Sequence, residues 1–84
     1  MNNELFVGPQ QNVKPEWIDH NGHMNVAFYL VAFDEAIGSL FRFLGLDRKY
    51  REIHKVATYC GDFHIRYVRE LHEDAPLKIT TQLI

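Results

Sequence analysis

The stretch that organises this chain reads Asp19-His20-Asn21-Gly22-His23-Met24-Asn25. Gly22 tolerates a positive φ angle, so the chain can turn sharply at that position. Asn25 is a favourable N-cap for a helix that begins at Val26. The sequence therefore predicts a polar loop that leads into a helix N-terminus, where backbone N–H groups lack helical partners and carry a partial positive charge.

Such a loop holds the groups that acyl transfer requires. The helix N-terminus could polarise a carbonyl oxygen. The neighbouring Asp19 could act as a general base or as a nucleophile. A structural interpretation stays open beside this one, because Asn-Gly is a common turn and Asp19 and Asn25 could serve only as caps.

The histidines raise the question of a metal site. His20 and His23 lie close to Asp19 in the loop. No second cluster of histidine or cysteine with ligand spacing follows, and the remaining histidines are scattered, at positions 54, 64 and 72. We therefore expect neither a metal ion nor another cofactor.

The segment behind the loop predicts one helix from Val26 to Leu44, with Gly45 as its C′ residue. Its apolar side chains recur at helical spacing, at Leu30, Phe33, Ile37, Leu40, Phe41 and Leu44. Further apolar residues widen this arc, so the helix needs cover over most of its girth. A sheet curled around a single helix would provide that cover.

Three extended segments are expected to supply the sheet. Leu5 to Ile18 contains Pro9 and Pro15, which confine it to an edge or interrupt it. Val56 to Leu71 is predicted as a long strand, because its side chains alternate with a period of two, and Gly61-Asp62 is interpreted as a bulge. The turn from His72 to Pro76 then leads into a strand from Leu77 to Ile84. The order strand, helix, strand, strand predicts an α+β fold with an antiparallel sheet.

Smaller features complete the prediction. Asp47 to His54 is polar and is interpreted as a loop with at most one helical turn. Trp17 is expected in the core or an interface. Cys60 is expected to be a small buried residue. Asp34, although an acid on the central helix, is expected to play a structural role.

Length and charge narrow the functional classes. The chain has 84 residues, which corresponds to one domain, and a thin core. A net charge of −2 without a basic stripe argues against nucleic-acid binding. The single cysteine excludes an internal disulfide and fits a reducing compartment. The first residues lack the apolar region of a signal peptide, and charged residues interrupt the helical segment, so we expect a cytoplasmic protein that does not enter a membrane.

The loop resembles a known family signature. Asp19-x-Asn21-x-His23-Met24-Asn25, followed by Tyr29, is similar to the Asp-x-Asn-x-His-Val-Asn-Asn-x-x-Tyr motif of hotdog-fold thioesterases that act on acyl-acyl-carrier proteins. The looser Asp-x-x-Gly pattern of the 4-hydroxybenzoyl-CoA thioesterase-like branch fits Asp19 and Gly22.

Further similarities extend along most of the chain. The run from Tyr29 to Ala36 resembles part of that family's central helix. Arg69-Glu70-Leu71 and Leu77-x-Ile79 resemble its second and third strands. The run from Pro15 to Asn25 also resembles thioesterases of carnitine breakdown, which act on betainyl-CoA.

The resemblance implies a fold and a function. Residues 1–84 would form a single, incomplete hotdog domain that lacks further strands after Ile84. Such a domain would hydrolyse an acyl thioester, carried by CoA or an acyl-carrier protein, and would self-associate as a homodimer or a larger assembly. The alternative is a non-catalytic acyl-binding or structural hotdog subunit.

The resemblance also assigns roles within the loop. Asp19 would be the general base or nucleophile, while Asn21 and His23 would orient water or Asp19. Backbone N–H groups from Gly22 to Asn25 would polarise the thioester carbonyl, so that Gly22, Met24 and Asn25 contact the substrate.

Overall fold

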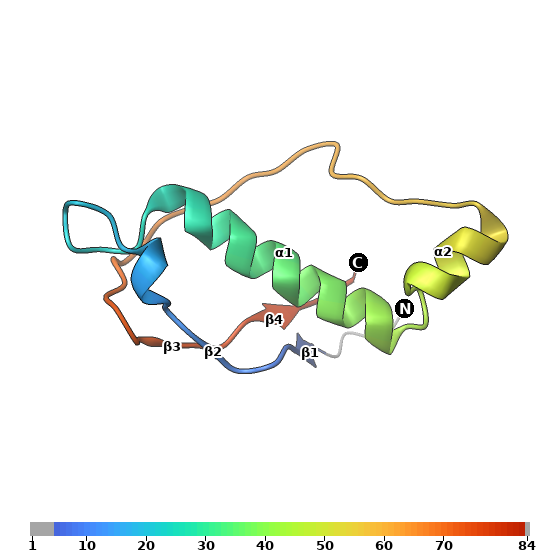
Figure 1. The fold of residues 1–84 in the computed structure, drawn as a ribbon, viewed down its shortest axis with the longest axis horizontal. Helices are drawn as coiled ribbons and strands as arrows, with labels where there is room; N and C mark the ends of the chain where they lie inside the picture. Colours follow the sequence, from blue (N-terminus) through green and yellow to red (C-terminus); the bar gives the residue numbers. More distant parts are fainter. Residues whose placement is uncertain (1–4, 84) are drawn as a thin grey trace.

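The computed structural model describes residues 5–83 and shows an α+β chain with one long central helix (Figure 1). Its elements are β1 (Phe6–Val7), β2 (Gln11–Asn12), the 3-10 helix η1 (Pro15–Trp17), α1 (Val26–Phe43), α2 (Arg48–His54), β3 (Pro76–Leu77) and β4 (Thr80–Thr81). The strands form two antiparallel pairs, β1 with β4 and β2 with β3. The predicted helix and the α+β class are therefore confirmed.

Local sequence signals account for both ends of α1. The Asn25 side chain accepts a hydrogen bond from the Ala27 N–H at 3.0 Å, as an N-cap does. The helix ends at Phe43, and Gly45 follows with φ of +79°. A positive φ at this point is typical of a glycine that terminates a helix.

The N-terminal segment runs antiparallel to the C-terminal one. Phe6 pairs with Thr81 and Gln11 pairs with Leu77. Between the two pairs, the Gly8 N–H donates to the Ile79 carbonyl at 2.9 Å. Pro9 has no N–H to donate, which helps to explain why the pairing breaks into two short ladders.

The core lies where α1 meets these strands. The buried apolar side chains among the described residues are Val13, Trp17, Met24, Ala32, Ala36 and Leu40. Trp17 is 3% exposed and stacks on Phe28 with ring centroids 6.0 Å apart, so its predicted place in the core is confirmed.

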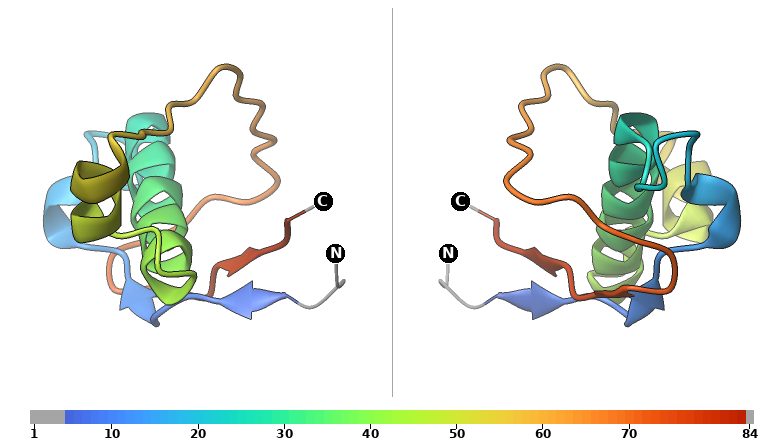
Figure 2. Two further views of the ribbon diagram at one scale, coloured as in Figure 1. Left: turned by 90° about the vertical axis from the view of Figure 1, so that its right-hand side faces the viewer. Right: turned by 90° about the vertical axis from the view of Figure 1, so that its left-hand side faces the viewer.

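The buried stripe of α1 differs from the predicted arc. Ala32, Ala36 and Leu40 recur every four residues and are buried, whereas Leu30 and Leu44 are exposed. The strands lie on one side of the helix (Figure 2), and the arc residues Phe33, Ile37 and Phe41 are only half-buried. The described strands therefore do not supply the broad cover that this apolar helix needs.

The predicted strand from Val56 to Leu71 is also wrong. These residues form no ladder, and most of their side chains are exposed. The segment arches away from the strands in both views of Figure 2. Alternation of apolar and polar side chains favours an extended chain, but a strand also needs a neighbouring strand that pairs with its N–H and C=O groups. No described segment pairs with this one. Gly61-Asp62 is therefore not a bulge, and Cys60 is exposed rather than buried.

The polar segment after α1 is a helix rather than a loop. The Asp47 side chain accepts a hydrogen bond from the Tyr50 N–H at 2.9 Å and caps α2. Arg48 and Glu52 form an ion pair at 2.9 Å, one turn apart. Lys55, in the left-handed region with φ of 52°, ends the helix. With these caps the segment forms a helix of seven residues, which is longer than the single turn that the sequence predicted.

The chain exposes more surface than a compact protein of its mass. Its accessible surface is 6954 Å², against about 5,200 Å² for a folded monomer of the same mass. The radius of gyration is 14.8 Å, against roughly 12 Å for a compact domain of this length. The excess reflects the arched segment and the uncovered side of α1. No helix in residues 5–83 has the length and apolar character needed to cross a membrane.

Candidate active site

The predicted loop is a closed turn in front of α1. Ile18 and Met24 form an isolated antiparallel bridge at its base. Inside the turn, the Asp19 N–H donates to the His23 carbonyl and the Gly22 N–H donates to the Asp19 carbonyl, both at 3.0 Å. Gly22 has φ of +80°, so the sharp turn predicted at this glycine is confirmed.

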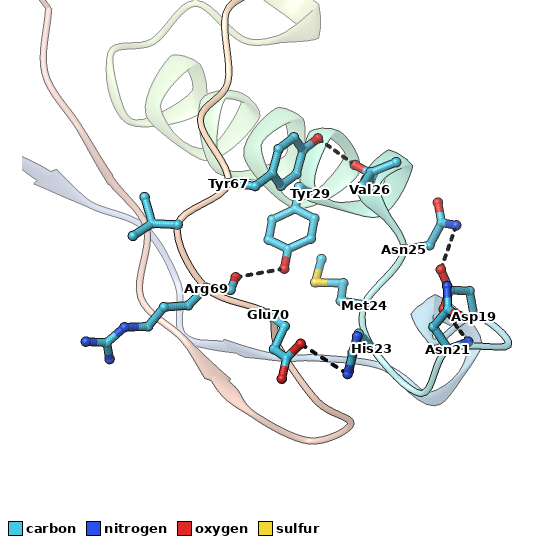
Figure 3. Close-up of a pocket in the computed structure, with 11 residues that line it drawn as sticks. Asp19, Asn21, His23, Met24, Asn25, Val26, Tyr29, Tyr67, Arg69 and Glu70 are labelled. Carbon is cyan, nitrogen blue, oxygen red and sulfur yellow. Dashed lines mark hydrogen bonds and ion pairs between the residues drawn. The ribbon is translucent and has the colours of Figure 1, made fainter.

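The Asp19 carboxylate is held by two donors from the same loop. Oδ1 accepts from the Asn21 N–H at 2.8 Å, and Oδ2 accepts from the Asn25 side-chain amide at 3.2 Å. Asn25 also caps α1 through its amide oxygen. One side chain therefore ties the carboxylate to the N-terminus of α1 (Figure 3).

These contacts determine the ionisation of Asp19. The Asn21 N–H makes the largest contribution and lowers the pKa of the Asp19 carboxyl below its ordinary value of 3.8. Partial desolvation opposes this effect, while the Asn25 amide and the imidazoles of His20 and His23 lower the pKa further. Asp19 is therefore ionised near neutral pH, as both a nucleophile and a general base must be.

A cleft of about 350 Å³ opens beside this carboxylate. It lies between the loop with the start of α1 and the segment Tyr67–Glu70 (Figure 3). Five of the six predicted site residues line it, namely Asp19, Asn21, His23, Met24 and Asn25. Gly22 does not line the cleft and shapes the turn behind it.

Most of the amides expected to face a substrate carbonyl are already engaged. The Met24 N–H donates to the Leu71 carbonyl at 2.7 Å, and the Asn25 N–H donates to the Trp17 carbonyl at 2.8 Å. The Gly22 N–H bonds within the turn. Within residues 5–83, the N–H groups of His23 and Val26 have no hydrogen-bond partner in the chain. Both residues line the cleft, so these two amides are available to a ligand on the side formed by the loop and the start of α1.

Two tyrosines, Tyr29 from α1 and Tyr67 from the opposite segment, meet across the cleft. The Tyr29 and Tyr67 rings meet edge to face, with centroids 4.9 Å apart. The Tyr67 hydroxyl donates to the Val26 carbonyl at 3.0 Å, and the Tyr29 hydroxyl makes a longer contact of 3.5 Å with the Arg69 carbonyl. Burial raises the pKa of the Tyr29 hydroxyl, so this hydroxyl is neutral near neutral pH.

The sequence pattern does not single out Tyr67 or Glu70 as site residues. Tyr67 reads as one of the apolar positions of an alternating strand, and Glu70 enters only through the resemblance to a family strand. The Tyr67 hydroxyl bonds to Val26, which is 41 positions away in the sequence. A long-range contact of this kind leaves no local signal.

Histidines that are distant in the sequence also meet at the edge of the cleft. Glu70 Oε2 lies 3.2 Å from His23 Nε2, and Glu70 Oε1 lies 3.8 Å from His72 Nε2. The two imidazole rings meet edge to face at 5.2 Å. His72, one of the histidines that are scattered in the sequence, therefore lies beside His23 in the fold.

Comparison with known proteins shows the family to which the sequence belongs. Residues 13–84 match the Thioesterase-like superfamily, and the chain is a member of it. The resemblance to thioesterases is thereby confirmed.

Among individual proteins, the chain is 36% identical over 72 residues to the betainyl-CoA thioesterase of Pseudomonas aeruginosa. That alignment covers 86% of this chain and 45% of the relative. It is 35% identical over 75 residues to the L-carnitine dehydrogenase/betainyl-CoA thioesterase of Agrobacterium fabrum, covering 89% of this chain and 15% of the relative.

The protein of the same description from Ruegeria pomeroyi is 33% identical over 70 residues, covering 82% of this chain and 14% of the relative. The chain thus spans about half the length of the first relative and a smaller part of the two longer ones. No solved structure matches it significantly.

Proposed function

We propose that this chain carries the catalytic loop of an acyl-CoA thioesterase, with Asp19 as the reactive carboxylate. The observation that carries the proposal is an ionised Asp19, tied through Asn25 to a helix N-terminus and facing a cleft. Membership of the thioesterase-like superfamily and the names of the relatives support the same reaction.

The chemistry can follow either of two routes. As a general base, Asp19 removes a proton from water while the water oxygen attacks the thioester carbonyl carbon. As a nucleophile, Asp19 attacks that carbon itself and forms an anhydride, which water then hydrolyses. In both routes the C–S bond breaks, CoA leaves as a thiolate that takes up a proton, and the acyl group ends as a carboxylic acid.

The N–H groups of Val26 and His23 are the proposed oxyanion donors. Negative charge develops on the carbonyl oxygen as the tetrahedral intermediate forms, and a helix N-terminus stabilises it. Asn21 holds Asp19 through its backbone N–H. The His23 imidazole lines the cleft and would orient the attacking water, while Met24, only 4% exposed, forms its floor.

The test of this proposal is thiol release from acyl-CoA substrates by Asp19→Asn. The change keeps the size of the side chain and removes its charge, so turnover should fall by roughly 10²–10⁴-fold, the usual contribution of a general base. Asp62→Asn makes the same chemical change at an exposed acid outside the cleft and should leave turnover unchanged.

Circular dichroism of each sample checks that α1 is intact. Normal turnover of Asp19→Asn would reject Asp19 as the reactive group. Absence of thiol release from the unmodified chain with every acyl-CoA would favour the alternative, a non-catalytic acyl-binding or structural subunit.

The cleft also supports a proposal for the acyl group. The Tyr29 and Tyr67 rings present aromatic surface, and Asp19 and Glu70 add carboxylates to the same cleft. Aromatic rings bind quaternary ammonium groups, and the carboxylates favour positive charge. A small cationic acyl group such as betainyl, after which the relatives are named, fits this lining.

An isosteric pair of substrates tests the charge directly. In 3,3-dimethylbutanoyl-CoA, carbon replaces the ammonium nitrogen of betainyl-CoA and the shape is retained. We expect a preference for betainyl-CoA of roughly 2- to 30-fold in kcat/KM, which corresponds to about 0.5–2 kcal/mol of cation–π attraction. Tyr67→Leu should reduce this preference. Equal kcat/KM values for the two substrates would reject a cation site and leave the thioesterase proposal intact.

We further propose that the hotdog sheet around α1 is completed by association. The described strands cover one side of the helix, and apolar side chains such as Val26, Leu30 and Phe43 are exposed. In a homodimer the cleft would lie near the subunit boundary, because its Tyr67 wall belongs to the segment without a strand partner.

A further inference from the structure

His23, Glu70 and His72 form a cluster whose combined chemistry goes beyond the roles proposed above for His23 and Glu70 alone, and a metal ion bound there would take the place of those two roles. One nitrogen from each imidazole and one carboxylate oxygen lie within 4.8 Å of one another. His23 is half-buried, while Glu70 and His72 are exposed. We propose that these three side chains bind one Zn²⁺ ion.

Backbone structure brings the three residues to one place. The Met24 N–H donates to the Leu71 carbonyl at 2.7 Å, which fixes the loop against the segment that contains Glu70 and His72. Alternate side chains of an extended chain point to the same face, so Glu70 and His72 share one side. Leu71, between them, packs against the core cluster on the other side.

Packing and hydrogen bonds hold both segments that carry the cluster. The Leu71 side chain is held by the core and its carbonyl is held by Met24. Asp19 and Met24 fix the position of His23, because the Asp19 N–H donates to the His23 carbonyl at 3.0 Å and Met24 follows directly in the chain. The three candidate ligands therefore project from positions that the fold holds together.

The donor set matches the preferences of zinc. Imidazole nitrogen and carboxylate oxygen are both common zinc ligands, and three protein ligands leave a fourth position for water. Bonds of about 2.0–2.2 Å in a tetrahedral site place ligand atoms roughly 3.3–3.5 Å apart. His23 and His72 lie 3.2 Å and 3.8 Å from the two different oxygens of Glu70. One ligand atom from each residue lies within 4.8 Å of the others, so the exposed Glu70 and His72 side chains would have to move closer by up to about an ångström to close the site.

The same geometry also allows simple ion pairs between Glu70 and protonated imidazoles. The two interpretations differ in what they require of His72. An ion pair with His23 at 3.2 Å is complete without His72, which lies farther from Glu70. A zinc site needs His72 as its third ligand, so His72 decides between them.

Titration calorimetry with ZnCl₂ on the tag-free 84-residue chain tests the proposal. All samples carry Cys60→Ser, because an exposed thiol is itself a zinc ligand. The variants are His72→Ala and Glu70→Gln, and the matched control is His64→Ala, an exposed histidine outside the cluster. Circular dichroism verifies that the helices are retained.

We expect one Zn²⁺ per chain and a loss of affinity of at least about tenfold in both variants, since even indirect partners of a zinc site contribute 10–100-fold. The control should bind as the parent does. In NMR spectra, Zn²⁺ should shift the ring signals of His23 and His72 and leave those of His54 and His64 in place.

Three results would overturn the proposal. One is the absence of stoichiometric binding to the parent chain. Another is binding by His72→Ala and Glu70→Gln that equals the control. The third is equally tight binding of Mg²⁺, which prefers oxygen ligands and would indicate a carboxylate site without the imidazoles. None of these readouts depends on thioesterase activity.

Discussion

The double role of Asn25 leads to a prediction that separates folding from catalysis. Its amide oxygen caps α1 by accepting from the Ala27 N–H at 3.0 Å, and its amide nitrogen donates to Asp19 at 3.2 Å. Asn25→Ala removes both contacts. Asn25→Asp keeps an oxygen that can cap the helix and replaces the donor by a carboxylate that faces Asp19.

The two variants should therefore differ in stability. Loss of an N-cap costs about 1 kcal/mol, within a range of roughly 0.5–2 kcal/mol, so Asn25→Ala should lower the free energy of unfolding by that amount. Asn25→Asp should stay closer to the parent, because aspartate is as good a cap as asparagine and its charge favours a helix N-terminus.

Their effects on Asp19 should run the other way. Removal of the amide donor raises the pKa of the Asp19 carboxyl in both variants, and the new carboxylate in Asn25→Asp raises it further. Asn25→Asp should be the more stable variant. It should also be the less active one, because it replaces the donor that holds Asp19 by a carboxylate that repels it. Its activity profile should shift to higher pH.

Urea unfolding followed by circular dichroism gives the free energies of unfolding. Thiol release measured between about pH 4 and pH 9 gives the activity profile. Gln10→Ala and Gln10→Glu make the corresponding changes at an exposed amide of the N-terminal segment and serve as the controls. The reasoning is refuted if Asn25→Asp retains the activity and pH profile of the parent, or if Asn25→Ala unfolds at the same urea concentration as the parent.

Three further predictions follow from the same structure. The pKa of Asp19 is lowered in the folded chain, so the stability that its ionised form contributes is present above the ordinary pKa of 3.8 and is lost as the pH falls through the lowered pKa. The thermal unfolding temperatures of the parent and Asp19→Asn should therefore converge in acid. A constant difference between the two temperatures at all pH values would contradict this. Gly22→Val should destabilise the chain by about 1–3 kcal/mol through the positive φ alone, since no atom lies within 4 Å of a Cβ at this position. Asparagine tolerates a positive φ better than valine, so Gly22→Asn should lower the free energy of unfolding in urea by less. Equal losses in the two variants would show that φ is not the cause. The uncovered side of α1 and the arched segment predict self-association, so sedimentation should give a mass that rises with concentration, and a monomer that binds little ANS would exclude it.

Features encoded within a few residues are predictable from this sequence. Gly22 and Gly45 have positive φ angles, and Asn25 caps the helix, as local rules require. Each of these features depends on the conformational freedom of one residue or on a hydrogen bond between near neighbours. The start of α1 and the closed turn before it follow directly from them.

Features that depend on distant partners are not predictable in the same way. The alternating residues from Val56 to Leu71 satisfy the pattern of a strand, yet no described segment provides the ladder. Cys60 is exposed for the same reason, since its predicted burial assumed a sheet around it. The meeting of Glu70 and His72 with His23 depends on the bond between Met24 and Leu71, 47 positions apart in the sequence numbering.

The two walls of the cleft therefore differ in how they are held. The Asp19 wall is fixed by hydrogen bonds within the turn and by its link to α1. The Tyr67 wall belongs to the arched segment and is held by the Tyr67 hydroxyl and the contacts of Tyr29. A partner strand that paired with the arched segment would reposition the Tyr67 wall and leave the Asp19 turn as it is. Under the proposed function, association should consequently alter the binding of the acyl group at the Tyr67 wall, measured as KM. It should alter the orientation of the Asp19 carboxylate less, because that carboxylate is held within the turn.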